Sequence, residues 1–325
     1  MDLFVIDQNP FSPENVSKET ANFNTKLDRL LSKLPPQYTL SPQKIRDDVE
    51  AGKGLWRVKR LDTLKDRKVL AKNREVPVRV YVPQKLNGVY LHLHGGGFML
   101  GRAYHQDVRL VQIANHCDLA VVGVDYRLAP ENPYPAAADD CEAVAVWLAK
   151  NIKREFGTKT LIIGGESAGA NLSVVTLIRM RDKHGFTGFC GANLVYGIYD
   201  LAMTPSARKW GESPKYILTT KLMKWFHENY VPADKINHPD VSPIYANLSN
   251  MPPALFTVGT LDPLLDDTLF MHARWISSGN EANLAVYPGG VHGFNIFPLK
   301  IARQANKRID EFLIKARNRT YHNTL

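Results

Sequence analysis

Cysteine is scarce in this sequence of 325 residues, which contains only three. Cys117, Cys141 and Cys190 are widely spaced and form neither a disulfide framework nor the CxxC pairs typical of metal sites. The simplest interpretation is three reduced, mostly buried thiols in a cytoplasmic protein. The scarcity therefore argues against a small scaffold held together by disulfides.

Long apolar runs are also missing. No stretch of about 18 uninterrupted apolar residues occurs, so the sequence predicts no membrane span. The first residues, MDLFVIDQNPFSPENVSKE, carry acids early and lack a basic segment followed by an apolar block, so they do not resemble a secretory signal. Internal repeats and low-complexity segments are absent as well. We expect a globular cytoplasmic protein, and the 44% hydrophobic and 22% charged residues suit one large α/β core or two small domains.

Acidic residues are fewer than basic ones, which gives a formal net charge of +9. Part of the excess lies in RVKRLDTLKDRKVLAKNR (57–74) and part in KARNR (315–319). Such an excess can indicate an anionic partner. However, the first run lacks interleaved aromatic residues and a nucleic-acid motif, and two aspartates interrupt it. We therefore expect a solvated, hairpin-like surface and no nucleic-acid partner, while a regulatory protein partner for this surface stays open.

Short apolar runs alternate with longer amphipathic stretches along most of the chain. The predicted strands are 77–83, 88–94, 118–126, 159–166, 190–197, 253–260 and 282–289. The predicted helices are 20–34, 105–117, 136–155, 168–183, 264–278 and 299–317. This alternation predicts an α/β fold with a mostly parallel, doubly wound sheet flanked by helices. The segment 200–245 breaks the rhythm and is expected to lie over the sheet as an insertion.

The stretch LIIGGESAGANL (161–172) places a serine between a predicted buried strand and a predicted helix. Gly165, Ser167 and Gly169 fit the pattern G-x-S-x-G, in which the serine occupies a strained turn. The residues two before and two after it approach each other and must be small. The pattern alone is weak, and a glycine-rich turn without chemistry is the alternative. The strand–turn–helix context favours a nucleophilic serine, next to a helix N-terminus that stabilises a developing anion.

A serine hydroxyl becomes a nucleophile only when a base takes its proton. In this fold the acid and the base follow the serine along the chain, on loops after later strands. Asp262 comes directly after a predicted strand, and His292 follows the next one in a glycine-rich loop. Asp262 precedes a proline at a helix start, so an N-cap role suits it equally well. Asp266 and Asp267 are interpreted as acids of a first helical turn, although Asp266 stays an alternative partner of His292.

The stretch YLHLHGGGFMLG (90–101) ends a predicted strand in three glycines, which cost the folded chain backbone entropy. His92 and His94 could bind a metal from one face of the strand, but no third ligand with suitable spacing lies nearby. We expect no metal site here, and interpret both histidines as supports of the loop. The glycines would let the backbone lie against a substrate beside Ser167.

Five motifs occur in a fixed order: HGGGF (94–98), DYRLAPENPYPAAADD (125–140), GESAG (165–169), DPLLDD (262–267) and HGF (292–294). Together they resemble the hormone-sensitive lipase family of α/β-hydrolases, in its bacterial esterase branch. LVYGIYDL (194–201) and DPLLDD are similar to the enterobacterial acetyl esterases. The resemblance covers roughly residues 75–315.

The resemblance implies an α/β-hydrolase domain over residues 51–325. Residues 1–50 and an insertion at about 200–240 would form a helical cap that shapes the acyl pocket. One departure is Glu166, because most relatives carry aspartate before the nucleophile. The charge is kept and one methylene is added, which leaves its contact with the DYRLAPE loop open.

The resemblance also implies the role of each site residue. Ser167 would be the nucleophile, His292 the general base and then acid, and Asp262 the group that orients His292. The oxyanion hole would consist of the backbone N–H groups of Gly96, Gly97 and Ala168.

The activity implied by the resemblance is hydrolysis of a small-molecule ester with a short, acetyl-type to roughly hexanoyl chain, through an acyl-enzyme. Neither a metal nor an organic cofactor is needed. Bulky aromatic residues could narrow the pocket or form only the core of the cap: Tyr196, Tyr199, Trp210, Tyr216, Trp225, Phe226 and Tyr230. The alternatives are hydrolysis of amides, formamides, carbamates or lactones by the same triad, and a non-catalytic ligand-binding protein of this fold.

Overall fold

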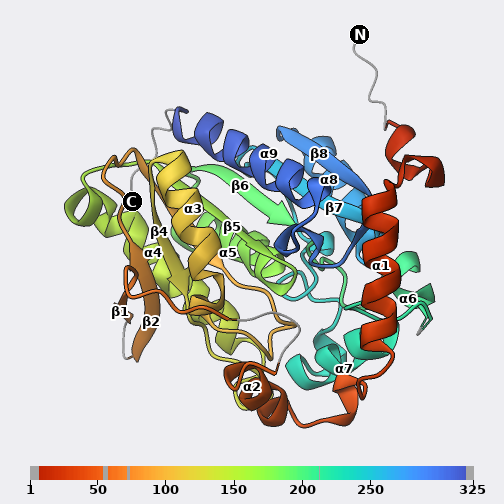
Figure 1. The fold of residues 1–325 in the computed structure, drawn as a ribbon. Coiled ribbons are helices and arrows are strands. Elements are labelled where there is room, and N and C mark those ends of the chain that lie inside the picture. Colours follow the sequence, from red (N-terminus) through yellow and green to blue (C-terminus); the bar gives the residue numbers. More distant parts are fainter. Residues whose placement is uncertain (1–6, 54–57, 72–73, 212, 320–325) are drawn as a thin grey trace.

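The computed structural model describes residues 7–53, 58–71, 74–211 and 213–319, and in this part of the chain the strands form one sheet (Figure 1). The strand order across the sheet is β1-β2-β4-β3-β5-β6-β7-β8. β2 runs antiparallel to both of its neighbours, and the other neighbouring strands run parallel. The strands are β1 (Lys65–Ala71), β2 (Arg74–Tyr81), β3 (Gly88–Leu93), β4 (Leu119–Val124), β5 (Leu161–Glu166), β6 (Phe189–Val195), β7 (Ala254–Leu261) and β8 (Ala282–Val291). The predicted mostly parallel sheet is confirmed.

The central strands are buried on both faces. Every residue of β3, β4 and β6 is buried, as expected for parallel strands with helices on both sides. This is why they appear in the sequence as continuous apolar runs. The edge strand β1 is mostly exposed and forms an antiparallel hairpin with β2.

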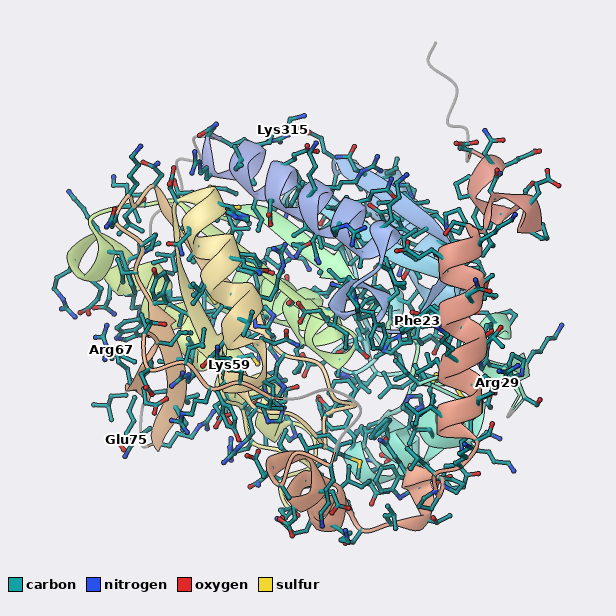
Figure 2. All side chains as sticks on the ribbon, in the orientation of Figure 1. Phe23, Arg29, Lys59, Arg67, Glu75 and Lys315 are labelled. Atoms are coloured by element: carbon teal, nitrogen blue, oxygen red, sulfur yellow. The ribbon has the colours of Figure 1, made fainter. Side chains whose placement is uncertain are left out.

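The hairpin explains most of the basic run at 57–74, although Arg57, Lys72 and Asn73 lie outside the described residues. Figure 2 shows Arg67 and Glu75 projecting from this edge of the sheet. Glu75 pairs with Lys68 across the hairpin at 2.6 Å, and the two side chains are 54% and 65% exposed. Such an exposed pair contributes little to stability, and the run is a solvated surface as predicted.

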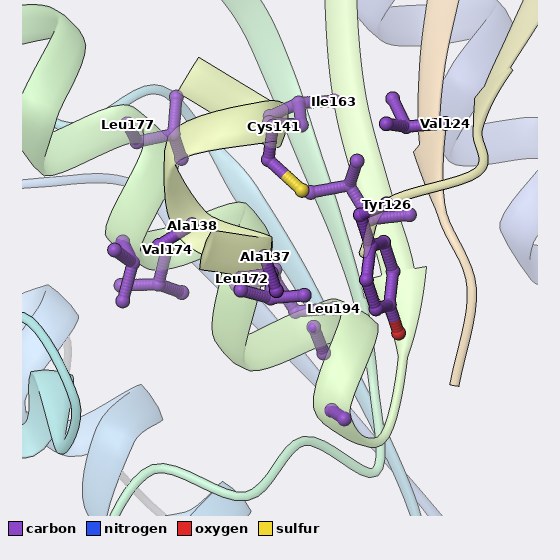
Figure 3. Packing of buried hydrophobic residues seen from close by; sticks show 14 of the residues in the cluster. Val124, Tyr126, Ala137, Ala138, Cys141, Ile163, Leu172, Val174, Leu177 and Leu194 are labelled. Atoms are coloured by element: carbon purple, nitrogen blue, oxygen red, sulfur yellow. The ribbon is translucent and has the colours of Figure 1, made fainter. Parts of the chain in front are cut away.

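Helices cover both faces of the sheet. α4 (Ala136–Phe156), α5 (Ala168–His184) and α8 (Leu265–Ser277) pack on one face, and Figure 3 shows Cys141 and Leu172 there beside Ile163 of β5. α3 (Asp107–Cys117) and α9 (Lys300–Arg317) cover the other face together with the N-terminal α1 (Lys18–Leu31). All three cysteines are buried and unpaired. The predicted helices are confirmed to within a few residues at each end.

Three helices were not singled out from the sequence. α2 (Pro42–Glu50) begins after Ser41, whose Oγ accepts a hydrogen bond from Lys44 N at 3.2 Å. α6 (Pro205–Lys209) and α7 (Thr220–Tyr230) lie within the insertion. Short 3-10 turns complete the structure: η1 (Asn9–Phe11), η2 (Pro13–Asn15), η3 (Gln37–Thr39), η4 (Ala103–Gln106), η5 (Ala233–Lys235), η6 (Pro243–Tyr245) and η7 (Phe294–Ile296).

The N-terminal segment and the insertion meet at one end of the molecule, where α1, α2 and α7 lie near one another (Figure 1). Asp28 of α1 accepts a hydrogen bond from Lys215 N at 2.6 Å, and Lys215 Nζ donates to the Leu34 carbonyl at 2.9 Å. Segments about 180 residues apart are therefore directly joined. In the part of the chain that is described, no helix has both the length and the apolar character needed to cross a membrane.

Candidate active site

Ser167 lies in the sharp turn between β5 and α5. Its φ of 55° and ψ of −119° are unusual for a residue with a side chain, at a cost of about 1–3 kcal/mol. A Cβ at Gly165 would lie 2.2 Å from the Leu93 carbonyl oxygen and 2.7 Å from Gly169, and a Cβ at Gly169 would lie 2.0 Å from the same oxygen. The prediction that both positions must be small is confirmed, and the neighbouring strand β3 adds a second reason for it.

Three side chains meet at the carboxyl edge of the sheet. His292, directly after β8, has its Nε2 3.0 Å from Ser167 Oγ. Its Nδ1 lies 2.9 and 3.1 Å from the two carboxylate oxygens of Asp262, which directly follows β7. Asp262 is fully buried and His292 is 8% exposed. The structure thus brings together the three residues that the sequence singled out from three separate loops.

The acidic residues that follow Asp262 have other partners. Asp262 Oδ1 also accepts a hydrogen bond from Leu264 N at 2.9 Å. The N-cap of α8 is Leu264, without a side-chain capping bond, so the interpretation of Asp262 as the N-cap is wrong. Asp266 accepts from Ser206 N at 2.8 Å and therefore faces α6 rather than His292. Of the two aspartates left open by the sequence, it is Asp262 that contacts the histidine.

Asp267 anchors the start of the insertion. Its carboxylate accepts hydrogen bonds from the backbone N–H groups of Tyr199 and Asp200, at 2.6 and 2.9 Å, and from Thr204 Oγ1 at 2.7 Å. Complete burial raises the pKa of Asp267 to about 7, against the effect of these donors. Asp266 and Asp267 do lie in the first turn of α8, as interpreted from the sequence. In addition, both bind residues of the insertion and attach it to this helix.

The chain after β3 forms what we call the glycine loop, residues 94–101. Gly96 and Gly97 have φ values of 118° and 60°. A Cβ at Gly96 would lie 2.1 Å from the Leu100 carbonyl oxygen, and one at Gly97 would lie 2.5 Å from the Phe226 ring. Among the described residues, no protein acceptor is found for the N–H groups of Gly96, Gly97 or Ala168. Those three donors are therefore available to an oxygen atom of a ligand beside Ser167.

His92 and His94 stabilise two neighbouring parts of the site. His92 contacts the turn that carries Ser167, and His94 contacts the glycine loop. His92 Nε2 lies 2.8 Å from Glu166 Oε2, so Glu166 contacts the neighbouring strand and not the DYRLAPE loop. That loop is instead held by Arg127, which pairs with Asp140 at 2.9 Å. The sequence left the contact of Glu166 open, and the structure assigns it to His92.

His94 acts on the glycine loop itself. Its Nδ1 lies 2.8 Å from the Gly95 carbonyl oxygen, and its ring stacks on Tyr126 with centroids 4.1 Å apart. Tyr126 in turn donates its hydroxyl to the His94 carbonyl at 2.7 Å. Burial lowers the pKa of His94 to about 4, so the ring is neutral near pH 7 and Nδ1–H is the donor.

A cleft of about 1850 Å³ leads to Ser167 and His292. Its walls come from the glycine loop, α7, the loop after β8 and the N-terminal segment around α2. Of the seven aromatic residues considered from the sequence, Tyr196, Tyr216 and Phe226 line the cleft. The remaining four do not, and Tyr199 and Tyr230 are core residues that are at most 1% exposed. Aromatic residues that the sequence did not single out line the cleft as well: Tyr38, Phe98, Tyr104, Tyr126 and Phe297.

Nothing in the sequence indicated the contacts that α2 makes with this site. Arg46 Nε donates to the Met99 carbonyl at 2.9 Å, and its Nη2 donates to the Ala129 carbonyl at 2.7 Å. A signal was present in Ser41-Pro42, the usual start of a helix. It identifies the helix but not the partner of its arginine.

Comparison with known proteins gives one consistent result. A family model for the alpha/beta hydrolase fold matches residues 90–296. The carboxylic ester hydrolase LipN of Mycobacterium tuberculosis is 34% identical over 241 residues, which are 69% of this chain and 62% of LipN, so less than two thirds of that relative is spanned. The acetyl esterase of Salmonella paratyphi A is 31% identical over 229 residues, or 68% of this chain and 69% of the relative. A solved esterase of Pyrobaculum calidifontis matches with a TM-score of 0.80 and 30% identity, over 89% of this chain and 97% of the other.

Proposed function

This chain belongs to the hormone-sensitive lipase family of α/β-hydrolases, and on that premise we propose that it is a serine carboxylesterase acting on short-chain acyl esters. The observation that carries the proposal is the continuous path of hydrogen bonds from Ser167 through His292 to Asp262. A nucleophile, a base and an orienting acid in this geometry are the arrangement required for acyl transfer.

The reaction begins when His292 Nε2 accepts the proton of Ser167 Oγ as this oxygen attacks the ester carbonyl carbon. The carbonyl oxygen becomes an oxyanion, which the N–H groups of Gly96, Gly97 and Ala168 stabilise. His292 then gives the proton to the leaving alcohol, and an acyl-enzyme remains on Ser167. Water, deprotonated by His292, attacks the acyl carbon in the same way and releases the acid. Asp262 holds the imidazole in the required tautomer throughout.

The restriction to short acyl chains rests on Phe226 and on the relatives. The Phe226 ring, 7% exposed, packs directly against Gly97 and limits the space beside the oxyanion donors. An acetyl or similarly short chain fits this narrow side, and the wide remainder of the cleft can take the alcohol part. The name of the Salmonella paratyphi A relative, an acetyl esterase, agrees with this assignment.

Residues 1–50 and about 200–240 act in this proposal as a cap over an α/β-hydrolase domain. The contacts of Lys215 with Asp28 and Leu34 support a joint unit formed by the two segments. Ile45 from the first segment and Leu222 from the second both line the cleft. The cap therefore shapes the substrate site without supplying a triad residue.

Initial rates on p-nitrophenyl esters from acetate to palmitate test the activity and the chain length together. We expect the highest kcat/KM for short chains, and a loss of kcat of about a million-fold in Ser167→Ala. In Phe226→Ala the ratio of the octanoate rate to the acetate rate should rise about tenfold, because the ring no longer restricts the pocket.

A wild-type enzyme faster on palmitate than on acetate would contradict the short-chain assignment. Activity retained in Ser167→Ala would contradict the acyl-enzyme route, whereas binding of a ligand without any turnover would favour a non-catalytic protein. Amide, formamide, carbamate and lactone substrates measured in parallel determine whether the ester is the preferred acyl compound.

A further inference from the structure

We propose that Arg46 is a positioning residue that holds the glycine loop in the geometry required for oxyanion binding, an inference that rests on the proposed function. Arg46 lies on α2, about 120 positions before Ser167 along the chain. It contacts no triad residue and acts through the backbone that carries two of the oxyanion donors.

The glycine loop has a backbone that needs support from outside. Gly96, Gly97 and Phe98 have consecutive positive φ values of 118°, 60° and 64°. Phe98 is not a glycine, so its conformation is unfavourable by itself. The hydrogen bonds within the loop run from Met99 N and Leu100 N to the Gly96 carbonyl, at 3.1 and 2.8 Å. Strained backbone of this kind persists only where surrounding contacts fix it.

Arg46, which also lines the cleft, supplies such contacts from α2. It donates to the Met99 carbonyl at 2.9 Å and to the Ala129 carbonyl at 2.7 Å, and so joins the glycine loop to the DYRLAPE loop. The same two loops are joined directly by Ala129 N, which donates to the Phe98 carbonyl at 3.0 Å. The guanidinium therefore adds a second connection between the two loops, directly after Gly97.

The two carbonyl acceptors belong to buried residues. Met99 is 0% exposed and Ala129 is 1% exposed, and within the described residues we find no other hydrogen-bond donor to either carbonyl. Removal of the guanidinium would leave two buried carbonyl groups unpaired unless the loop moved. We therefore expect the glycine loop to shift, and the N–H groups of Gly96 and Gly97 to shift with it.

The contact depends on the shape of arginine as well as on its charge. Arg46 also pairs with both carboxylate oxygens of Glu131 at 2.9 Å, but Glu131 is 53% exposed and such a pair contributes little. A planar guanidinium reaches two carbonyls and a carboxylate at once, which a lysine ammonium cannot do. Arg46→Lys should therefore be nearly as impaired as Arg46→Ala.

α2 has a second attachment that should survive these changes. At its last residue, Glu50 accepts a hydrogen bond from the Tyr104 hydroxyl and lies 3.3 Å from His105 Nε2. Ile45 is 5% exposed and packs inward. The helix should stay docked without the guanidinium, so that the variants affect the loop more than the fold.

The test uses the full chain with Arg46→Ala, Arg46→Lys and the matched control Lys44→Ala. The Lys44 side chain lies on the same helix, is 55% exposed and pairs with Asp48. We measure kcat and KM on p-nitrophenyl acetate, and inhibition by a methyl trifluoromethyl ketone that forms a tetrahedral adduct with Ser167. We also measure hydrogen exchange of peptides that cover residues 95–106 and β5. Both Arg46 variants should lose at least about tenfold in kcat with KM nearly unchanged, because small misplacements of catalytic groups cost up to about 100-fold. Ketone affinity should fall in parallel, and exchange at Met99 and Leu100 should accelerate while β5 stays protected.

An unchanged kcat in Arg46→Lys and Arg46→Ala, with the wild type active, would overturn the positioning role. An equal loss of kcat in Lys44→Ala would overturn it too. The same holds if the Arg46 variants change only KM and thermal stability. If Arg46→Ala does not fold, Arg46→Lys carries the same test. If the wild type has no esterase activity but the glycine loop still exchanges faster in the Arg46 variants, the proposed function is refuted. The structural role of Arg46 in holding the loop is then supported alone.

Discussion

The two sides of the candidate active site are held by different means. Ser167, Asp262 and His292 stand directly after β5, β7 and β8, so the sheet itself places them. The glycine loop also follows a strand, but its shape depends on α2 and α7, which come from distant parts of the chain. The proposed triad and the Ala168 N–H group are thus positioned by the sheet, whereas the other two proposed oxyanion donors, at Gly96 and Gly97, and the proposed acyl pocket depend on long-range contacts.

This difference has a structural cause. The carboxyl ends of parallel strands meet at one edge of a sheet, so one residue after each strand suffices to assemble a triad. A loop with three consecutive positive φ values has no such frame. Phe98 is stacked on Tyr230 of α7 with centroids 3.9 Å apart, and Arg46 of α2 binds the next carbonyl. In our proposal the cap therefore supports the oxyanion donors of the glycine loop as well as the pocket.

Among the changes that compare the two sides, the largest effect is expected on the sheet side, in Asp262→Asn. An asparagine would keep the shape but favour the wrong tautomer of His292, and kcat should fall by about 10,000-fold. The matched change Asp266→Asn, four residues later in the same motif, alters the acceptor of the hydrogen bond from Ser206 N, on a side chain that faces α6 rather than His292. It should alter kcat by less than about fivefold, since a hydrogen bond of this kind contributes about 1 kcal/mol.

Steady-state kinetics on p-nitrophenyl acetate with both variants measures this contrast. Near-normal turnover in Asp262→Asn, or equal losses in the two variants, would show that the sheet edge does not supply the orienting acid.

A smaller effect is expected on the loop side, in Gly97→Ala. The new methyl group would lie 2.5 Å from the Phe226 ring at a φ of 60°, and the loop must move to admit it. We expect kcat to fall by about 100- to 1000-fold, as when one oxyanion donor is lost. The double variant Gly97→Ala/Phe226→Ala removes the collision and should recover part of this loss.

The comparison of single and double variants separates sterics from backbone strain. A double variant no better than Gly97→Ala would mean that α7 does not determine the position of the loop, and the distinction between the two sides would weaken.

The smallest effect is expected in the stability of the protein at acidic pH. His227 of α7 is completely buried, which lowers its pKa to about 4 from an ordinary value of 6.5. Between these pH values His227 is protonated in the unfolded chain but not in the folded chain. The free energy of unfolding therefore falls as the pH drops through this window. The full loss from pH 7 to pH 4 is on the order of 3 kcal/mol for this one group.

Urea unfolding of wild type, His227→Gln and the exposed control His238→Gln at pH 7 and pH 4.5 measures the effect. His227→Gln should show a shallower decline than the other two proteins. Parallel declines in all three would place the acid sensitivity elsewhere, for example at His94.

The sequence predicted the sheet and the triad because both produce local signals. Buried parallel strands are continuous apolar runs, and Ser167, Asp262 and His292 directly follow three of them. α2 escaped notice because a nine-residue helix with one buried residue depends on tertiary contacts more than on its own pattern.

The walls of the cleft were harder to predict for the same reason. Whether an aromatic residue lines a pocket or fills a core depends on how α7 packs, and only three of seven candidates line the cleft. The partner of Glu166 was likewise beyond reach, because β3 and β5 are neighbours only in the folded sheet.

The Leu93 carbonyl oxygen, against which both glycines of the serine turn pack, also limits how such a protein can change over time. The spacing between Ser167 and the glycine loop is determined by main chain against main chain, where any added side chain collides. Random mutagenesis should therefore find almost no tolerated variation at Gly165 and Gly169, and new substrate preferences should arise through α2 and α7. A library for altered selectivity is best concentrated on those two helices, with the serine turn left unchanged.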